Sequence, residues 1–212
     1  MPKSFIYLHN FMGKTDWLEI SSWLGLIATI GLTIQLLLGM MMGTAYKKSQ
    51  LWKRIPRQFK KFTVYLLHNF FARTVLVLIC LHAICLLFNS NPSLTVLELF
   101  LPFLGRHQPI VITMGSISLY AALLVFLTSL LRIRIKLSFR TWKNIHLVTY
   151  ILAPLFILHG LLVDIALKDQ AVDWLDGEKL ISVGCGIVLL EASILRYRYY
   201  ILNKKKMKKT DP

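Results

Sequence analysis

Acidic residues and cysteines are scarce in this 212-residue chain. Its 10 Asp and Glu stand against 25 Lys and Arg, and its three cysteines show neither CxxC nor CxxCH spacing. The absence of these motifs excludes covalent attachment of a c-type haem. We interpret Cys80, Cys85 and Cys185 as packing residues, because all three fall within strongly apolar sequence.

A nucleotide-binding module is also missing from the sequence. No G-x-G-x-x-G motif follows a predicted strand, and the polar connections are far shorter than the ~30 residues of one βαβ unit. If the protein uses a flavin or a quinone, we expect a partner to supply it.

Apolar sequence, in contrast, is abundant, since 56% of the residues are hydrophobic. Several runs exceed the roughly 18 residues that mark a membrane-spanning helix. We therefore predict an all-α integral membrane bundle of five spans, forming a single domain over 1–212 with a basic cytoplasmic tail at 203–212. The spans are predicted at about 17–46, 62–89, 109–131, 142–167 and 180–202.

Two shorter apolar stretches are not predicted to span. The segment LTVLELFLPFLG at 94–105 carries Glu98 and is broken by Pro102, so we expect it to lie at the interface or to fold back. The segment SFIYLHNFM near the N-terminus is interrupted by His9 and lacks a small-residue cleavage site. It does not match a signal peptide.

The basic residues predict which ends of the spans face the cytoplasm. They gather in the first and third connections and after the last span, whereas the last connection is acidic. The positive-inside rule then places the N-terminus outside and the C-terminus inside. Because topology accounts for this charge, we expect membrane lipid and no nucleic acid as a partner. The clearest basic positions are Lys47, Lys48, Lys53, Arg54, Arg132, Arg134, Lys136, Arg140, Lys204, Lys205 and Lys206.

Four histidines lie within two of the predicted spans. His68 and His82 are 14 residues apart, and His146 and His159 are 13 residues apart. Ionisable side chains are costly inside a membrane, so each marks a functional site by default. Both spans run from inside to outside. The histidines therefore form an inner pair, His68 with His146, and an outer pair, His82 with His159, about 20 Å apart.

Matched pairs at two depths suit a flat macrocycle held between two helices. Neutral imidazole nitrogens bind iron, and the surrounding aliphatic and phenyl side chains supply the apolar pocket that haem needs. Fourteen helical residues return to nearly the same face, whereas thirteen do not. A kink at Pro154 could bring His146 and His159 into line. This arrangement favours two haem groups, each held by a pair of histidines.

Other interpretations of the histidines stay open. A single histidine on an apolar helix is more often a hydrogen-bonded packing residue, and the set could also form a proton or ion path. A zinc or copper site would need three or four clustered ligands, which the two levels do not offer. His9 and His107 fall in predicted outer segments, where a solvated loop histidine is the simpler interpretation.

One stretch resembles a known family. The run WKNIHLVTYILAPLFILHGL at 142–161 is similar to the fifth helix of the ferric-reductase-like transmembrane domain. That domain is shared by ferric reductases, NADPH oxidases and the haem-binding membrane subunit of the bacterial methionine sulfoxide reductase system. With the histidines of the second span, the resemblance covers about 62–202. The matching positions are Trp142, His146, Tyr150, Ala153, Pro154, His159 and Leu161.

The resemblance implies a b-type cytochrome core that carries electrons outward. His68 with His146 would ligate the inner haem, and His82 with His159 the outer one. Reductases and oxidases of the family usually have six spans and a fused flavin and nicotinamide module, whereas we predict five spans and no module. We therefore expect an electron-transfer subunit of an oxidoreductase in the cell membrane, with a bacterial plasma membrane favoured. Its donor would be a separate cytoplasmic flavoprotein reductase or quinol, and its acceptor an extracytoplasmic ferric iron or redox partner.

Further polar and small residues lie within the spans. Arg73 is predicted to contact a haem propionate or to pair with Glu191 of the last span. Glycines of the first span allow close helix contact, within this bundle or with a partner. These are Gly25, Gly31, Gly39 and Gly43.

Rival functions remain at this stage. A quinol-oxidising cytochrome subunit of the bc type also carries two histidine pairs on two helices. A proton-coupled carrier would bind no haem, and its transport would depend on pH in the range where imidazole titrates. A third possibility is a membrane subunit whose haems only stabilise a complex.

Overall fold

The computed structural model describes residues 16–44, 46–48, 50–56, 60, 63–89, 94–105, 108–131, 136–163 and 177–210. Within these ranges every regular element is helical, and five helical segments are long and apolar enough to cross a membrane. The predicted all-α fold with five spans is confirmed. The side of the membrane that each terminus faces stays a prediction.

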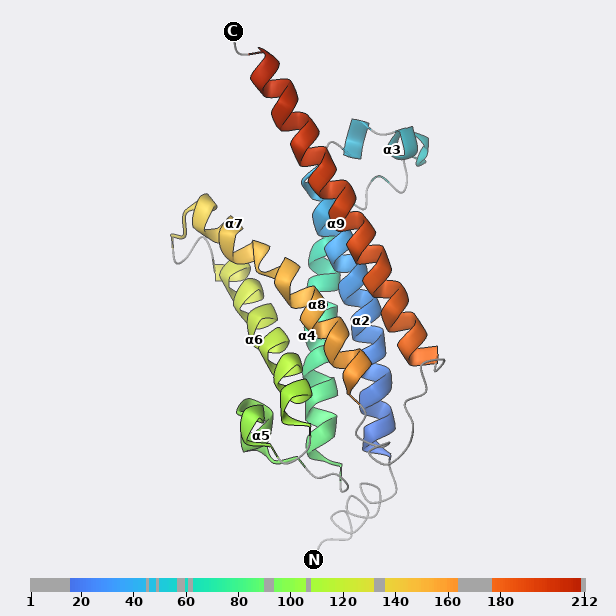
Figure 1. Cartoon of the computed structure of the whole chain (residues 1–212), viewed down its shortest axis with the longest axis vertical. Coiled ribbons are helices and arrows are strands. Elements are labelled where there is room, and N and C mark those ends of the chain that lie inside the picture. The colour runs from blue at the N-terminus through green and yellow to red at the C-terminus, as the bar shows by residue number, and fades with distance from the viewer. Residues whose placement is uncertain are drawn as a thin grey trace, which may run out of the picture.

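The five spans are built from six helices (Figure 1). Side-chain caps fix three of the starts, because Asp16, Thr63 and Ser138 each accept the backbone N–H of the residue three positions later. The helices are α2 (Trp17–Met42), α4 (Val64–Leu87), α6 (Pro109–Leu131), α7 (Phe139–Leu147), α8 (Thr149–Leu162) and α9 (Gly177–Thr210).

The structure differs from the predicted boundaries in several spans, and α2 ends at Met42, four residues before the predicted end of the first span. The fourth span begins three residues earlier and is divided into α7 and α8, which meet at Val148. The last helix, α9, continues through Thr210, so most of the predicted tail at 203–212 is helical. Residues 164–167, predicted as the end of the fourth span, lie outside the described residues.

Several polar side chains inside the spans form hydrogen bonds within their own helices. Lipid offers no hydrogen-bond partner, so a buried hydroxyl must find a backbone carbonyl. Serine and threonine hydroxyls accordingly donate to the carbonyl four residues earlier. The pairs include Thr29 to Gly25, Thr33 to Thr29, Ser118 to Met114, Ser129 to Val125 and Ser193 to Leu189, at 2.7–2.9 Å.

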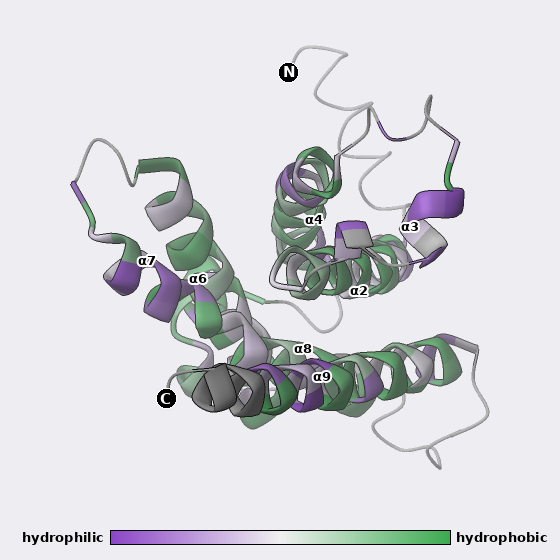
Figure 2. Cartoon of the chain, turned by 90° about the horizontal axis from the view of Figure 1, so that it is seen from above, coloured by the Kyte–Doolittle hydropathy of each residue, from purple (hydrophilic) through white to green (hydrophobic). Residues whose placement is uncertain are grey.

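Helix α2 is the centre of the bundle. It contacts α4, α8 and α9, while α6 packs against α8. Seen from above, α2 lies between α4 and the pair formed by α8 and α9 (Figure 2). Its Gly31 faces Val75 of α4 so closely that an added Cβ would lie 2.8 Å from the Val75 Cγ2 atom. This contact brings α4 and α2 together between the two histidine levels.

Short helices lie at both ends of the bundle. At one end are η1 (Tyr46–Lys48) and α3 (Gln50–Arg54), which carry basic residues. At the other end, α5 (Val96–Phe100) and η3 (Pro102–Leu104) fold back, and the Ser116 and Tyr120 hydroxyls of α6 donate to carbonyls of α5. The segment at 94–105 therefore does not span.

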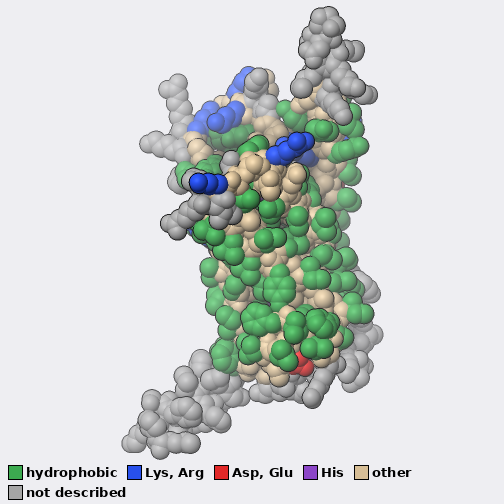
Figure 3. Space-filling view, turned by 90° about the vertical axis from the view of Figure 1, so that its left-hand side faces the viewer, with side chains coloured by type: hydrophobic (Ala, Val, Ile, Leu, Met, Phe, Trp, Pro, Cys, Tyr) green, Lys and Arg blue, Asp and Glu red, His purple; other side chains and the backbone are tan. Residues whose placement is uncertain are grey.

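The lateral surface is apolar. Large side chains such as Phe70, Leu130 and Leu195 are more than 60% exposed, as expected for groups that contact lipid. On the face shown in Figure 3, hydrophobic side chains fill the middle and basic side chains gather toward one end. This distribution agrees with a multi-pass membrane protein.

Gly31→Leu should destabilise the bundle by about 1–3 kcal/mol, because the new side chain would force α2 away from Val75. Thermal unfolding of the purified protein, followed by circular dichroism, should show a lower midpoint. The matched control is Gly184→Leu in α9, where an added Cβ meets nothing within 4 Å. Equal midpoints for the two variants would contradict the close α2 to α4 contact.

Candidate functional site

The structure brings the four histidines together in the two predicted pairs. His68 of α4 faces His146 of α7, with ring centres 6.0 Å apart, and His82 of α4 faces His159 of α8, with ring centres 6.3 Å apart. The two levels are separated by 14 residues of α4, or about 21 Å along the helix. The two histidines of each pair thus lie face to face. That they ligate a metal stays a prediction.

Both histidines of the fourth span face α4, and the span divides into α7 and α8 between them. On one ideal helix His146 and His159 would point about 140° apart. The chain instead interrupts the helix at Val148, whose N–H bonds to Ile145, and the Thr149 hydroxyl donates to the His146 carbonyl at 2.8 Å. Helix α8 then runs through Pro154. The interruption lies six residues before the proline from which we expected a kink.

Three of the histidines pack against a glycine of a neighbouring helix. Gly25 and Gly39 of α2 face His82 and His68, and Gly115 of α6 faces His159. A Cβ added at these glycines would lie 2.8–3.3 Å from the nearest imidazole atom. The missing side chains therefore make the room that the rings occupy.

The same three histidines share one hydrogen-bond arrangement. A carbonyl oxygen can only accept, so the imidazole Nδ1 must be the protonated donor in each case. This tautomer leaves the Nε2 lone pair free, which is the form that binds a metal. The accepting carbonyl is always four residues before the facing glycine. The pairs are His68 with Gln35 at 3.0 Å, His82 with Ser21 at 2.8 Å and His159 with Val111 at 2.8 Å.

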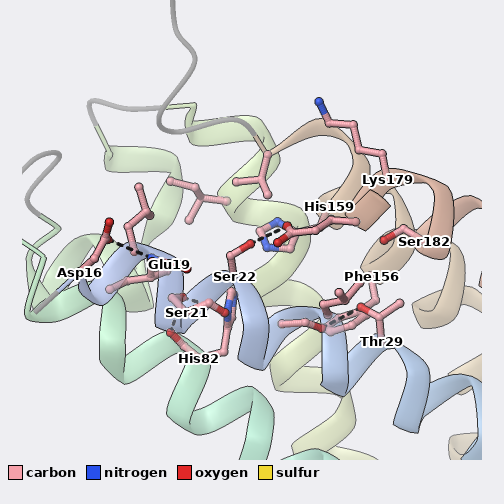
Figure 4. Close-up of a pocket in the computed structure, with 18 residues that line it drawn as sticks. Asp16, Glu19, Ser21, Ser22, Thr29, His82, Phe156, His159, Lys179 and Ser182 are labelled. Atoms are coloured by element: carbon pink, nitrogen blue, oxygen red, sulfur yellow. Dashed lines mark hydrogen bonds between the residues drawn. The ribbon is translucent and has the colours of Figure 1, made fainter. Parts of the chain in front are cut away.

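Ser21 adds a second contact to the outer pair. Its side chain is only 1% exposed, and its hydroxyl donates to the backbone carbonyl of His82 at 3.0 Å. The serine carbonyl in turn accepts from the His82 ring, as the dashed lines in Figure 4 show. This reciprocal bonding holds the start of α2 to the outer part of α4.

His146 lacks this arrangement. Its Nδ1 atom is buried and has no hydrogen-bond partner among the described residues. The ring is instead stacked on Trp142, with ring centres 5.2 Å apart and planes tilted by 31°. The Trp142 indole N–H donates to the Ser129 hydroxyl of α6 at 3.2 Å. The inner pair therefore has one anchored and one unanchored imidazole.

A cavity of about 410 Å³ adjoins the outer pair. Both outer histidines line it, together with apolar residues such as Leu26, Ile112 and Phe156 (Figure 4). Charged side chains also line it, namely Asp16, Glu19, Glu178 and Lys179. Glu178 accepts a hydrogen bond from the Ser22 hydroxyl at 2.7 Å. An apolar interior with charged groups suits an amphiphilic ligand.

The ring spacing and donor chemistry fit a metal held between two imidazoles. An imidazole nitrogen binds a transition metal at about 2.0–2.1 Å, so two rings on opposite sides of one metal have centres roughly 6 Å apart. Both observed separations agree with this value. No group of three or more metal-ligating side chains occurs in the described part of the chain. The arrangement thus fits a haem better than a clustered zinc or copper site.

Arg73 lies apart from the histidine pairs. Five helical residues separate it from His68, which places it about 140° around α4. Its side chain is exposed, as is that of Glu191 on α9, and the two do not form an ion pair in the structure. Contact with a haem propionate stays a prediction. Arg132 and Arg134 of the third connection lie outside the described residues, as do Asp169, Asp173 and Asp176, the aspartates of the acidic last connection.

Sequence reasoning found the histidines but not what supports them. We noted Gly25 and Gly39 only as sites of helix contact and did not consider Gly115. One signal was available: the two glycines of α2 are 14 residues apart, the same spacing as His68 and His82.

These observations define a class of protein, namely an all-α membrane bundle with two pairs of facing histidines. Residues 24–157 match the family model described as "Ferric reductase like transmembrane component". The chain belongs to this family, which indicates a redox or electron-transfer role in a membrane. The match includes three of the paired histidines and ends two residues before His159. No curated protein and no solved structure matches the chain significantly.

The shared hydrogen-bond arrangement predicts the tautomer of three imidazoles. In protein labelled with ¹⁵N-histidine and reconstituted in bilayers, Nδ1 of His68, His82 and His159 should be protonated and Nε2 should not. Gly115→Val should remove His159 from this pattern, and Gly184→Val should leave it unchanged. Solid-state NMR distinguishes the two nitrogens. Protonated Nε2 atoms in the unsubstituted protein would contradict the geometry.

Proposed function

We propose that this chain is a membrane b-type cytochrome that moves electrons across the bilayer through two haems. The observation that carries the proposal is the pair of histidine sites about 21 Å apart on α4, each with ring centres close to 6 Å apart. When bound, haem supplies reversible one-electron chemistry. The protein would supply ligation, orientation and insulation.

Each supporting residue has a defined task in this proposal. His68 and His146 would hold the inner haem, and His82 and His159 the outer one. The carbonyls of Ser21, Gln35 and Val111 would fix three rings with Nε2 free, and donation from Nδ1 raises the basicity of a ligating imidazole.

The apolar side chains between the two levels would keep water and ions out of the electron path. Val75, Ile79 and Phe156 form a buried cluster with Ala28 between α2, α4 and α8. Ions and protons are disfavoured in an apolar layer of this kind, because burying a charge without a partner costs free energy. The cluster therefore supports transfer between two fixed sites rather than passage of protons.

The direction of transfer follows from the predicted topology. With the N-terminus outside, electrons would enter at the inner pair and leave at the outer pair. A membrane potential that is negative inside favours this direction by about 2.3 kcal/mol per 100 mV. The donor would be a separate flavoprotein reductase or a quinol, and the acceptor an extracytoplasmic ferric species or redox protein. The expected location is a bacterial cell membrane.

His82→Ala should remove the outer haem and leave the inner site largely occupied, because the two pairs share no ligand. A pyridine haemochrome assay should give two haem b per unsubstituted chain and about one per variant chain. His107→Ala, at a histidine outside both pairs, is the matched control and should keep two. Two haems in the His82 variant would contradict the pairing. No haem in any chain after haem-replete expression would favour a haem-free proton-coupled carrier instead.

A further inference from the structure

The four imidazoles are not equivalent. Three of them donate from Nδ1 to a backbone carbonyl and rest against a glycine, whereas His146 has neither contact among the described residues. A buried ring nitrogen without a partner is uncommon, because leaving it unsatisfied costs about 1–3 kcal/mol. His146 is therefore the one imidazole of the four that no hydrogen bond from Nδ1 to a described residue holds in place.

His146 also lies near the end of a short helix. The residue is the second to last of α7, a helix of nine residues that ends just before Val148. His159 likewise lies in the last turn of its helix, α8, but its Nδ1 atom is anchored to the Val111 carbonyl. The His146 ring stacks on Trp142 and faces His68, and a hydrogen bond to Ser129 links that tryptophan to α6. Within the described part of the chain, no hydrogen bond from the His146 Nδ1 atom has to break when the ring moves.

The missing hydrogen bond also weakens His146 as a ligand. Loss of a supporting hydrogen bond behind a ligating histidine typically costs 10–100-fold in metal affinity. On that scale the bond from iron to His146 would be the weakest of the four. His68, on the other side of the same site, is buried and anchored to Gln35 and would remain bound.

A second cavity begins one helical turn from His146, although neither inner histidine lines it. This space of about 340 Å³ lies between α2, α8 and α9 and is lined by apolar residues, with Tyr150 and Ser193 as the exceptions. Tyr150 is one helical turn beyond His146, and Met40 is adjacent to Gly39, which faces His68. Apolar cavities take up small apolar molecules readily.

We propose that the inner histidine pair is a gas-binding site. A small neutral diatomic ligand replaces His146 there, whereas both histidines of the outer pair stay in place and no such ligand binds. This inference rests on the proposed function, because it requires haem at both pairs. With haem bound, the His146 Nε2 atom would release the iron and the diatomic molecule would take its place. The exchange would transfer no electron, and His68 would continue to hold the haem.

The test is carbon monoxide binding to the reduced full-length protein in bilayers, measured by difference spectroscopy. We expect one of the two haems to bind carbon monoxide. In His82→Ala, which keeps the inner haem, binding should persist. In His68→Ala, which keeps the outer haem, it should be lost. The outer haem is thus an internal control for damage to the protein.

A second variant keeps all four histidines. Trp142→Phe removes the indole donor to Ser129 but retains a ring beside His146, so carbon monoxide should bind several-fold faster. Trp17→Phe, at a tryptophan that stacks on Phe88 near the other end of the bundle, is the matched control and should leave the rate unchanged.

The outcomes separate the two proposals. Two haems of which only the inner one binds carbon monoxide would support the inference. The inference would be overturned if neither of the two haems bound carbon monoxide, or if the outer haem bound it. Either result would leave the proposed function intact. Absence of haem from the unsubstituted protein would overturn the proposed function itself.

Discussion

The hydrogen bond from an imidazole Nδ1 to a carbonyl of the neighbouring helix is the interaction on which the site depends. It occurs at His68, His82 and His159, and each time a glycine four residues after the carbonyl makes room for the ring. The bond has two consequences. It chooses the tautomer that leaves Nε2 free, and it ties the direction of the ring to the packing of two helices. Ligand geometry and bundle geometry are therefore set together.

This coupling explains why α2 matters although it carries no histidine. The carbonyls of Ser21 and Gln35 accept from His82 and His68 of α4 at two levels. Gly25 and Gly39 leave room for the two rings, and Gly31 provides the close contact between those levels. A shift of α2 along α4 would misplace both rings at once. The inner and outer sites should consequently respond together to changes in this helix pair. Changes in α7 should affect the inner site, because α7 carries His146, whereas α6 supports the outer site through Val111 and the inner site through Ser129.

Much of this was predictable from the sequence, for physical reasons. Long apolar runs have few alternatives to a spanning helix, so the five spans were found, and the spacing of His68 and His82 indicated two levels. The division of the fourth span at Val148 was not predicted, because no glycine or proline occurs there. We expected a kink at Pro154 instead. Carbonyl acceptors such as that of Val111 give no signal either, since every residue has one. The lack of an acceptor for His146 could be seen only in three dimensions.

The central claim is that electrons pass through both histidine pairs in series. It is tested most directly in vesicles that contain the haem-loaded protein and a trapped membrane-impermeant oxidant such as ferricyanide, with an impermeant reductant added outside. The account predicts that the trapped oxidant is reduced, and that the rate falls to that of protein-free vesicles when either His68 or His82 is replaced by alanine. An unchanged rate in either variant would contradict a path through both pairs, as would a protein-free rate when both haems are present.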